Sequence, residues 1–215
     1  MSDVLRSWIA KPGRLTMAER YHNATLATDI LIAPPFNAGH EADLDDCPLA
    51  ALLGAMDAES TINPARWEGD KAPYTPNIGY GLLQWTPWTK LRTWCQNNGY
   101  PNWEGNGDAQ MAKLANEFTT SDPEEKEFFG SATYPTPATF KAFLQPQSDQ
   151  PWASNIETAC RIFVYNYLRP ANPEGSMTAR IASAKRMLNW LRNDYKPHSA
   201  DLPIWLLFKF NGRGV

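Results

Sequence analysis

Apolar residues recur along most of the chain at the three- and four-residue intervals that are typical of helices. The clearest example follows residue 45, where the residues that share one face are Leu49, Leu52, Leu53 and Met56. The same periodicity predicts further helices over residues 15–32, 107–118, 154–168 and 176–192. Because strand-like alternation is rare, we expect a mostly α (α+β) fold with a small β or loop insertion after the helix that carries Leu49.

Polar residues at the expected helix starts support these assignments. Thr16 with Glu19, and Ser154 with Glu157, have the spacing of a capping box. Asp108 is expected to cap the helix that begins near residue 107.

Proline and glycine define the segments between the helices. The stretch 62–81 contains three prolines and three glycines, so we expect turns and a short hairpin there. Residues 33–46, with paired prolines and several acidic residues, are expected to form a loop. Residues 81–99 show helical spacing on both sides of Pro87.

Composition narrows the function classes. The chain has 215 residues, 43% of them hydrophobic, and a formal net charge of −3. No cluster of lysine and arginine stands out, which disfavours nucleic-acid recognition. The N-terminal stretch lacks the apolar core of a signal peptide. No apolar run approaches the roughly 20 residues of a membrane-spanning helix, so we expect no transmembrane segment.

The cysteine and tryptophan residues give little indication of a cofactor. Cys47, Cys95 and Cys160 are isolated and lack zinc-site spacing. We expect them to be small buried hydrophobes, and we expect neither a metal nor another cofactor. Most of the nine tryptophans are expected in the core.

Glu59 lies where charge is unfavourable. It follows Met56 by three residues and Leu52 by seven, so it continues the apolar face of its helix. It also lies at the expected C-terminal end of that helix, where the dipole disfavours a negative charge. Desolvation would act in the same direction and keep a proton on the carboxyl group, as a general acid requires. The alternative is an ordinary helix-end glutamate that faces solvent.

Three sequence blocks occur in a recognisable order: ESTINP at 59–64, IGYGLLQWTP at 78–87 and FVYNYLRPANP at 163–173. Together they resemble the phage tail lysozyme family, peptidoglycan hydrolases carried on virion tails. The resemblance covers roughly residues 15–192 and looks closest to lysozyme domains of phage tail-knob proteins. The pairing of ES with GLLQ is also similar to that of lytic transglycosylases and goose-type lysozymes.

The resemblance implies a lysozyme-like domain and assigns roles by motif. Glu59 would be the catalytic acid, Gln84 would line the cleft, and Trp85 would pack beside it or against sugar. Tyr167 would face the acid from a later helix. One position departs from the family pattern, because Leu168 stands where the family has a glutamate in its YERP stretch.

Two glycines bracket Tyr80, which we expect to help position the sugar. Gly79 and Gly81 would allow the backbone to approach the substrate closely, or would simply serve a tight turn. Both interpretations can hold together.

Glycoside hydrolysis normally requires a second carboxylate. Glu68 and Asp70 lie in the insertion where a lysozyme-like fold would place one, and we favour Asp70 because Gly69 frees its backbone. Both acids would otherwise belong to turns. If neither faces the cleft, Glu59 alone could act as acid and then base, with a sugar group as nucleophile, which is the lytic transglycosylase route.

The expected organisation has three parts. Residues 1–14 would be an extension, 15–195 the lysozyme-like catalytic domain, and 196–215 a tail whose apolar stretch from residue 201 could dock onto a neighbouring subunit. The expected partners are bacterial peptidoglycan and other phage tail proteins. The expected location is the virion, at a tail tip or tail knob. The alternatives are an endolysin in the host cytoplasm and a non-catalytic glycan-binding tail protein.

Overall fold

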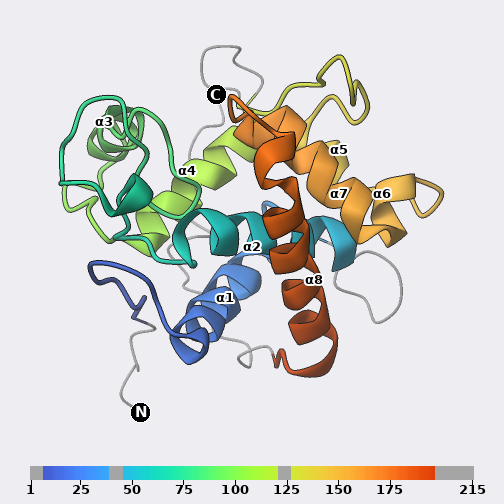
Figure 1. Ribbon diagram of the computed structural model, residues 1–215, viewed down its shortest axis with the longest axis horizontal. Coiled ribbons are helices and arrows are strands. Elements are labelled where there is room, and N and C mark those ends of the chain that lie inside the picture. Colours follow the sequence, from blue (N-terminus) through green and yellow to red (C-terminus); the bar gives the residue numbers. More distant parts are fainter. Residues whose placement is uncertain (1–6, 39–45, 121–126, 197–215) are drawn as a thin grey trace.

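The computed structural model describes residues 7–38, 46–120 and 127–196. The described chain is mostly helical, and its ribbon is shown in Figure 1, so the predicted fold class is confirmed. The elements are α1 (Met17–Leu31), α2 (Asp46–Ser60), η1 (Glu68–Asp70), α3 (Thr89–Asn97), α4 (Gly107–Thr119), α5 (Phe140–Leu144), α6 (Pro151–Ser154), α7 (Ile156–Phe163), η2 (Val164–Leu168), η3 (Glu174–Ser176) and α8 (Met177–Asn193).

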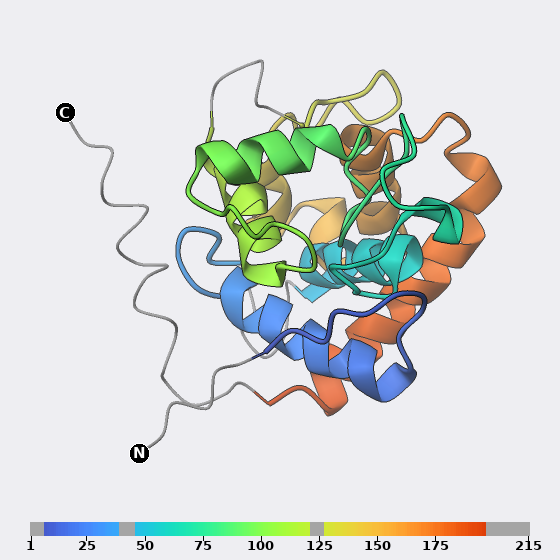
Figure 2. The ribbon, with the colours of Figure 1, turned by 90° about the vertical axis from the view of Figure 1, so that its left-hand side faces the viewer.

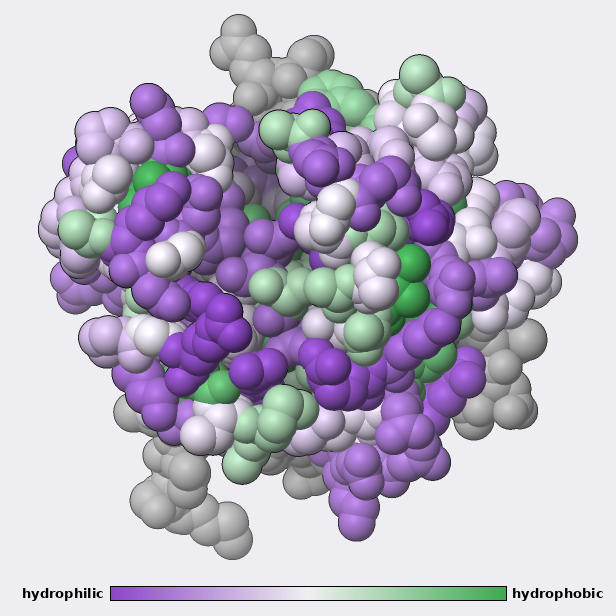
Figure 3. Space-filling model, in the orientation of Figure 1, coloured by the Kyte–Doolittle hydropathy of each residue, from purple (hydrophilic) through white to green (hydrophobic). Residues whose placement is uncertain are grey.

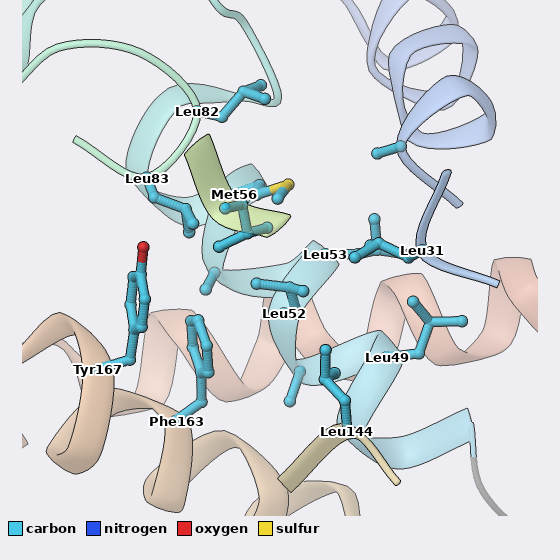
Figure 4. Packing of buried hydrophobic residues seen from close by; sticks show 14 of the residues in the cluster. Leu31, Leu49, Leu52, Leu53, Met56, Leu82, Leu83, Leu144, Phe163 and Tyr167 are labelled. Atoms are coloured by element: carbon cyan, nitrogen blue, oxygen red, sulfur yellow. The ribbon is translucent and has the colours of Figure 1, made fainter. Parts of the chain in front are cut away.

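Helix α2 forms the centre of the fold, and α8 packs across it (Figure 1). The predicted apolar face is confirmed, because Leu49, Leu52, Leu53 and Met56 are all fully buried. Figure 4 shows these residues between Leu31 of α1 and two rings, that of Phe163 at the end of α7 and that of Tyr167 in η2. Because α2 is buried almost all round, it lies in the core of the protein. The elements that precede and follow it in the chain pack against it and are held in place.

Gly54 determines how closely α2 and α8 approach. A Cβ atom added at this position would overlap the backbone of Ala184 in α8. The crossing therefore depends on the absence of a side chain at residue 54, and it brings the first half of α8 against the C-terminal half of α2.

Of the two predicted capping boxes, one forms in the structure and the other does not. Thr16 and Glu19 form the expected capping box of α1. The second predicted box is wrong, because Ser154 ends the short helix α6 and the side chain of Asn155 caps α7 instead. Pro151, at the first position of α6, begins that separate helix.

The start of α4 also differs from the prediction. Asn106 is its N-cap, accepting a hydrogen bond from the backbone N–H of Ala109. Asp108 lies in the first turn and accepts a hydrogen bond from Trp8 Nε1 at 2.9 Å. The expected capping residue therefore binds the N-terminal segment rather than its own helix.

Residues 61–88 form the insertion that was expected after α2. It contains η1 and two isolated β-bridges, Trp67 with Tyr80 and Tyr80 with Trp85. The helix predicted before Pro87 is wrong, because Gly81 and Gln84 adopt left-handed conformations, with φ of 84° and 53°. A left-handed residue ends a helix, so residues 81–84 form a turn and α3 begins only at Thr89.

The described part of the N-terminal segment packs on the helices. Figure 2 shows it running back along α1. Asn23 bonds to both backbone groups of Ile9, and Asn63 Nδ2 donates to the carbonyls of Lys11 and Gly13. The segment predicted to dock elsewhere, 201–215, lies outside the described residues.

The three cysteines are buried and form no disulfide with one another, which confirms their predicted place in the core. Burial raises the pKa of the Cys95 thiol to about 12 and that of Cys160 to about 11, so both remain protonated hydrophobes at neutral pH. Within the described ranges, no helix has the length and apolar character needed to cross a membrane.

Candidate active site

The end of α2 and the GLLQ turn are joined directly. Ser60 Oγ lies 2.9 Å from the carbonyl oxygen of Met56 and 3.0 Å from that of Leu82, so one hydroxyl proton serves both acceptors. The backbone N–H of Asn63 donates to the same Oγ at 3.2 Å. All of these groups are buried, so the serine of the ES pair ties the helix end, the chain after it and the turn into one unit.

The GLLQ turn is held from its other side by Gln110 of α4. Its Oε1 accepts from Leu82 N–H at 2.8 Å, and its Nε2 donates to the carbonyl of Pro64 at 2.8 Å. A Cβ atom on Gly81 would overlap this amide, and φ at Gly81 is +84°. Gly81 therefore serves the tight turn and the close approach of Gln110, and its contact with substrate stays a prediction.

Glu59 lies next to Ser60 and is paired with α8. Arg180 reaches Oε1 with Nε at 3.0 Å and with Nη2 at 2.5 Å, while the glutamate side chain is 20% exposed. Among the described residues, no hydrogen bond to Oε2 is formed. The apolar face of α2 ends at Glu59, because α8 crosses α2 at this point and places the guanidinium of Arg180 beside the carboxylate.

A cavity of about 420 Å³ opens beside the GLLQ turn. Its lining residues are Leu83, Gln84, Trp85, Thr86, Lys90, Glu127, Tyr167, Leu168 and Arg169. Figure 3 shows the surface hollowed between the part that carries α3 and the upper end of α8. The structure thus brings together three residues that the motifs assigned to the cleft, namely Gln84, Trp85 and Tyr167.

Tyr167, which was expected to face Glu59, is hydrogen-bonded to a different glutamate. Its hydroxyl donates to Oε2 of Glu117 at 2.5 Å. The glutamate is fully buried on α4, and its Oε1 accepts from Trp85 Nε1 at 3.0 Å and from Lys113 Nζ at 2.6 Å. Desolvation raises the pKa of the Glu117 carboxyl, and Lys113 opposes that shift. Burial and the adjacent carboxylate raise the pKa of Tyr167 well above its usual value, so its hydroxyl keeps its proton.

Sequence reasoning missed Glu117, although a signal was present. It follows Leu114 by three residues, on the buried side of α4. The same position on an apolar helix face drew attention to Glu59.

Glu127 was also missed, and it forms a charged rim on the cavity. Its carboxylate lies 3.2 Å from Lys90 Nζ and 3.0 Å from Arg169 Nη2. Leu168, which replaces the family glutamate, lines the cavity next to this group. No local sequence pattern connects residues 90, 127 and 169, because the tertiary fold alone brings them together.

The two candidate second carboxylates lie on η1, and neither lines the cavity. Glu68 Oε2 accepts from the backbone N–H of Gly79 at 2.8 Å, and Asp70 Oδ1 lies 3.3 Å from Arg66 Nε. Their side chains are 45% and 52% exposed. Their catalytic role stays a prediction.

Tyr80 does not line the cavity either. It is 2% exposed, and its hydroxyl accepts from the backbone N–H of Gly105 at 2.8 Å. Its ring packs against Trp67 and Trp103 inside the insertion. Burial makes this side chain part of the internal packing of this region, and its contact with sugar stays a prediction.

The described residues include no group of three histidine, cysteine or acidic side chains placed to hold a metal ion.

Comparison with known proteins identifies the family. A model of the phage tail lysozyme family matches residues 41–191. The chain belongs to the phage tail lysozyme family. All three motif blocks lie inside the matched span, and the resemblance read from them is confirmed.

One curated relative is similar to part of the chain. Morphogenesis protein 1 of Bacillus phage B103 is 35% identical over 125 residues, which make up 58% of this chain and 30% of that protein. The match thus spans less than a third of the relative's length.

Proposed function

We propose that the protein cleaves the glycan strand of peptidoglycan between its amino sugars, with Glu59 as the proton donor to the leaving oxygen. The observation that carries the proposal is the bond from Ser60 to the GLLQ turn, 3.0 Å from Oγ to the Leu82 carbonyl. It fixes the helix end that bears Glu59 to the turn that bears Gln84 and Trp85. Membership of the phage tail lysozyme family supports the same chemistry.

The contacts of Glu59 leave one of its oxygens for proton transfer. Arg180 occupies Oε1 only, so Oε2 can carry the proton that is given to the glycosidic oxygen. After the transfer, the guanidinium stabilises the carboxylate that is left, because a paired charge is favoured over an unpaired one in a partly buried site. In the next step, the same carboxylate can accept a proton from the group that attacks the sugar.

Hydrolysis needs a group that acts on the opposite face of the sugar. We assign that role to Asp70, with Glu68 as the alternative. Asp70 lies in the insertion that begins a few residues after Glu59. Its carboxylate lies 3.3 Å from Arg66, and about half of its side chain is exposed. A partly exposed ion pair is weak, so Asp70 can leave it when substrate binds.

A specific observation favours a second candidate function, lytic transglycosylation. Glu68 is bound to the backbone of Gly79 and Asp70 is paired with Arg66. If these contacts persist with substrate, neither of the two candidate second carboxylates takes part, and catalysis rests on Glu59. It would then act as acid and afterwards as base, with the sugar's own group as nucleophile, and the product would be an anhydro sugar.

Digestion of purified peptidoglycan in ¹⁸O-labelled water distinguishes the two reactions. Hydrolysis breaks the glycosidic bond with water, so each new reducing end carries one labelled oxygen. Transglycosylation closes an internal ring and incorporates no label. We expect labelled reducing ends by mass spectrometry. Unlabelled anhydro products would replace the hydrolase assignment with the second candidate, and a complete lack of cleavage would leave a glycan-binding role.

We further propose that the enzyme acts from the phage tail tip or knob, where it opens the host wall locally as the tail penetrates. The support is the family and its phage morphogenesis relative. Immunoblotting of purified particles tests this location. Absence of the protein from particles, with abundance in the lysate, would favour an endolysin.

A further inference from the structure

We infer that Glu117 is a positioning residue of the cavity, whose buried carboxylate fixes the orientation and the hydrogen-bonding direction of Tyr167 and Trp85 for a bound amino sugar. This inference rests on the proposed function. Neither the family motifs nor the proposed catalysis assigns Glu117 a role.

The geometry places one carboxylate behind two cavity walls. Tyr167 comes from η2 and Trp85 from the GLLQ turn, and both line the cavity. Their polar atoms turn inward to opposite oxygens of Glu117, at 2.5 Å and 3.0 Å. The glutamate side chain itself is 0% exposed, so it acts through these two residues and does not touch a ligand.

The direction of these bonds determines what the walls can offer. An ionised carboxylate only accepts hydrogen bonds, so the Tyr167 proton must point toward Glu117. The Tyr167 hydroxyl and the Trp85 N–H are thus both bound to Glu117 and turned away from the cavity. The two residues present their rings to the cavity in one fixed orientation. These walls suit a ligand with an apolar face, such as the ring of an amino sugar.

Stability alone does not explain the charge on this group. A buried ion pair contributes little relative to apolar residues of similar size, because desolvation offsets the attraction. Lys113 supplies the compensating charge at 2.6 Å, from the preceding turn of the same helix. What the ionised glutamate provides, and an apolar residue cannot, is a fixed direction for the two hydrogen bonds.

The test is binding of a soluble N-acetylglucosamine tetramer, measured by calorimetry on protein that carries Glu59→Gln. Adding Glu117→Gln places an amide beside Tyr167, which can donate as well as accept, so the hydroxyl proton is no longer fixed. We expect the dissociation constant to rise about tenfold, the equivalent of one charged hydrogen bond. Tyr167→Phe should weaken binding to a similar extent, and the double variant should be no weaker than the weaker single variant.

A matched control is available on the surface. Tyr74 donates to Glu104 at 2.5 Å in an exposed pair of the same chemistry, and Glu104→Gln should leave binding unchanged. Additive losses in the double variant, or equal effects of Glu117→Gln and Glu104→Gln, would overturn the inference. If Glu117→Gln does not fold, Tyr167→Phe decides, because it keeps the ring and removes only the hydroxyl. Wild-type affinity of Tyr167→Phe would then be the contradicting result.

The binding measurement is independent of the catalytic assignment. It is made in protein that carries the Glu59 substitution, so an error in the choice of proton donor leaves it unchanged. Failure to bind the tetramer in that parent protein would instead count against the proposed glycan substrate.

Discussion

Replacing Ser60 with alanine tests how the two central motifs depend on each other. The change removes one buried hydroxyl and alters the shape of the helix end very little. It deletes the tertiary bond to the Leu82 carbonyl at 3.0 Å and the acceptor for Asn63 N–H. The bond to the Met56 carbonyl also disappears, but it is local to α2.

The expected cost follows from what remains unpaired. Asn63 N–H keeps a contact with the Ser60 carbonyl at 3.3 Å, so the main loss is the buried Leu82 oxygen. Leaving one buried acceptor without its partner costs about 1–3 kcal/mol. A loss near 2 kcal/mol corresponds to a fall in Tm of roughly 4–8 °C in a domain of this size. The loss of activity should be larger than the fraction of unfolded protein explains, because the turn that bears Gln84 is no longer fixed to the helix that bears Glu59.

Denaturant unfolding followed by tryptophan fluorescence, with a turbidity assay on cell walls, gives both quantities. Thr119→Ala is the matched control, since Thr119 Oγ1 bonds to the Ala115 carbonyl at 2.9 Å in the last turn of α4 and makes no tertiary bond. It should change the free energy of unfolding by less than about 0.5 kcal/mol. If Ser60→Ala costs no more than this control and retains full activity, the proposed coupling of the motifs is wrong.

Two further predictions concern stability. Gly54→Ala should lower the free energy of unfolding by about 1–3 kcal/mol, because its Cβ would overlap the backbone of Ala184; unchanged denaturation would show that α2 and α8 separate at no cost. Glu19 has its pKa lowered from 4.5 to about 2, chiefly by its hydrogen bond from Lys11, so its stabilisation is present above pH 4.5 and declines as the pH falls toward 2. The Tm difference between wild type and Glu19→Gln should therefore be smaller at pH 3 than at pH 6, and an equal difference at both values would contradict the assignment.

The sequence predicted those features that depend on local pattern. The apolar face of α2 was predictable because its four residues recur at helical spacing, and the capping box of α1 because its two residues are three apart. The helix start at Ser154 was mispredicted because Asn155 is an equally good cap and Pro151 begins a separate helix. Helical spacing also misled near Leu82, where the turn depends on left-handed backbone conformations at Gly81 and Gln84.

In the candidate site too, the residues marked by a local motif were predictable and their partners were not. Gln84, Trp85 and Tyr167 were assigned by motif, and the structure places all three on one cavity. The partners of the acidic residues could not be predicted, because they come from elements distant in sequence. Arg180 is 121 residues from Glu59, and Tyr167 is 50 residues from Glu117. Pairing of this kind depends on how the helices cross, and local sequence pattern does not reveal the crossing.

The most direct test of the account is the rate at which Glu59→Gln releases muropeptides from purified peptidoglycan. The substitution keeps the contact with Arg180 possible and removes the transferable proton. Glu157→Gln, at an exposed ion pair with Lys185, is the control for loss of a surface charge. The account predicts a loss of at least about a hundredfold for Glu59→Gln, with unchanged folding and with wild-type rates for the control. A folded Glu59→Gln protein that releases muropeptides at the wild-type rate would contradict it.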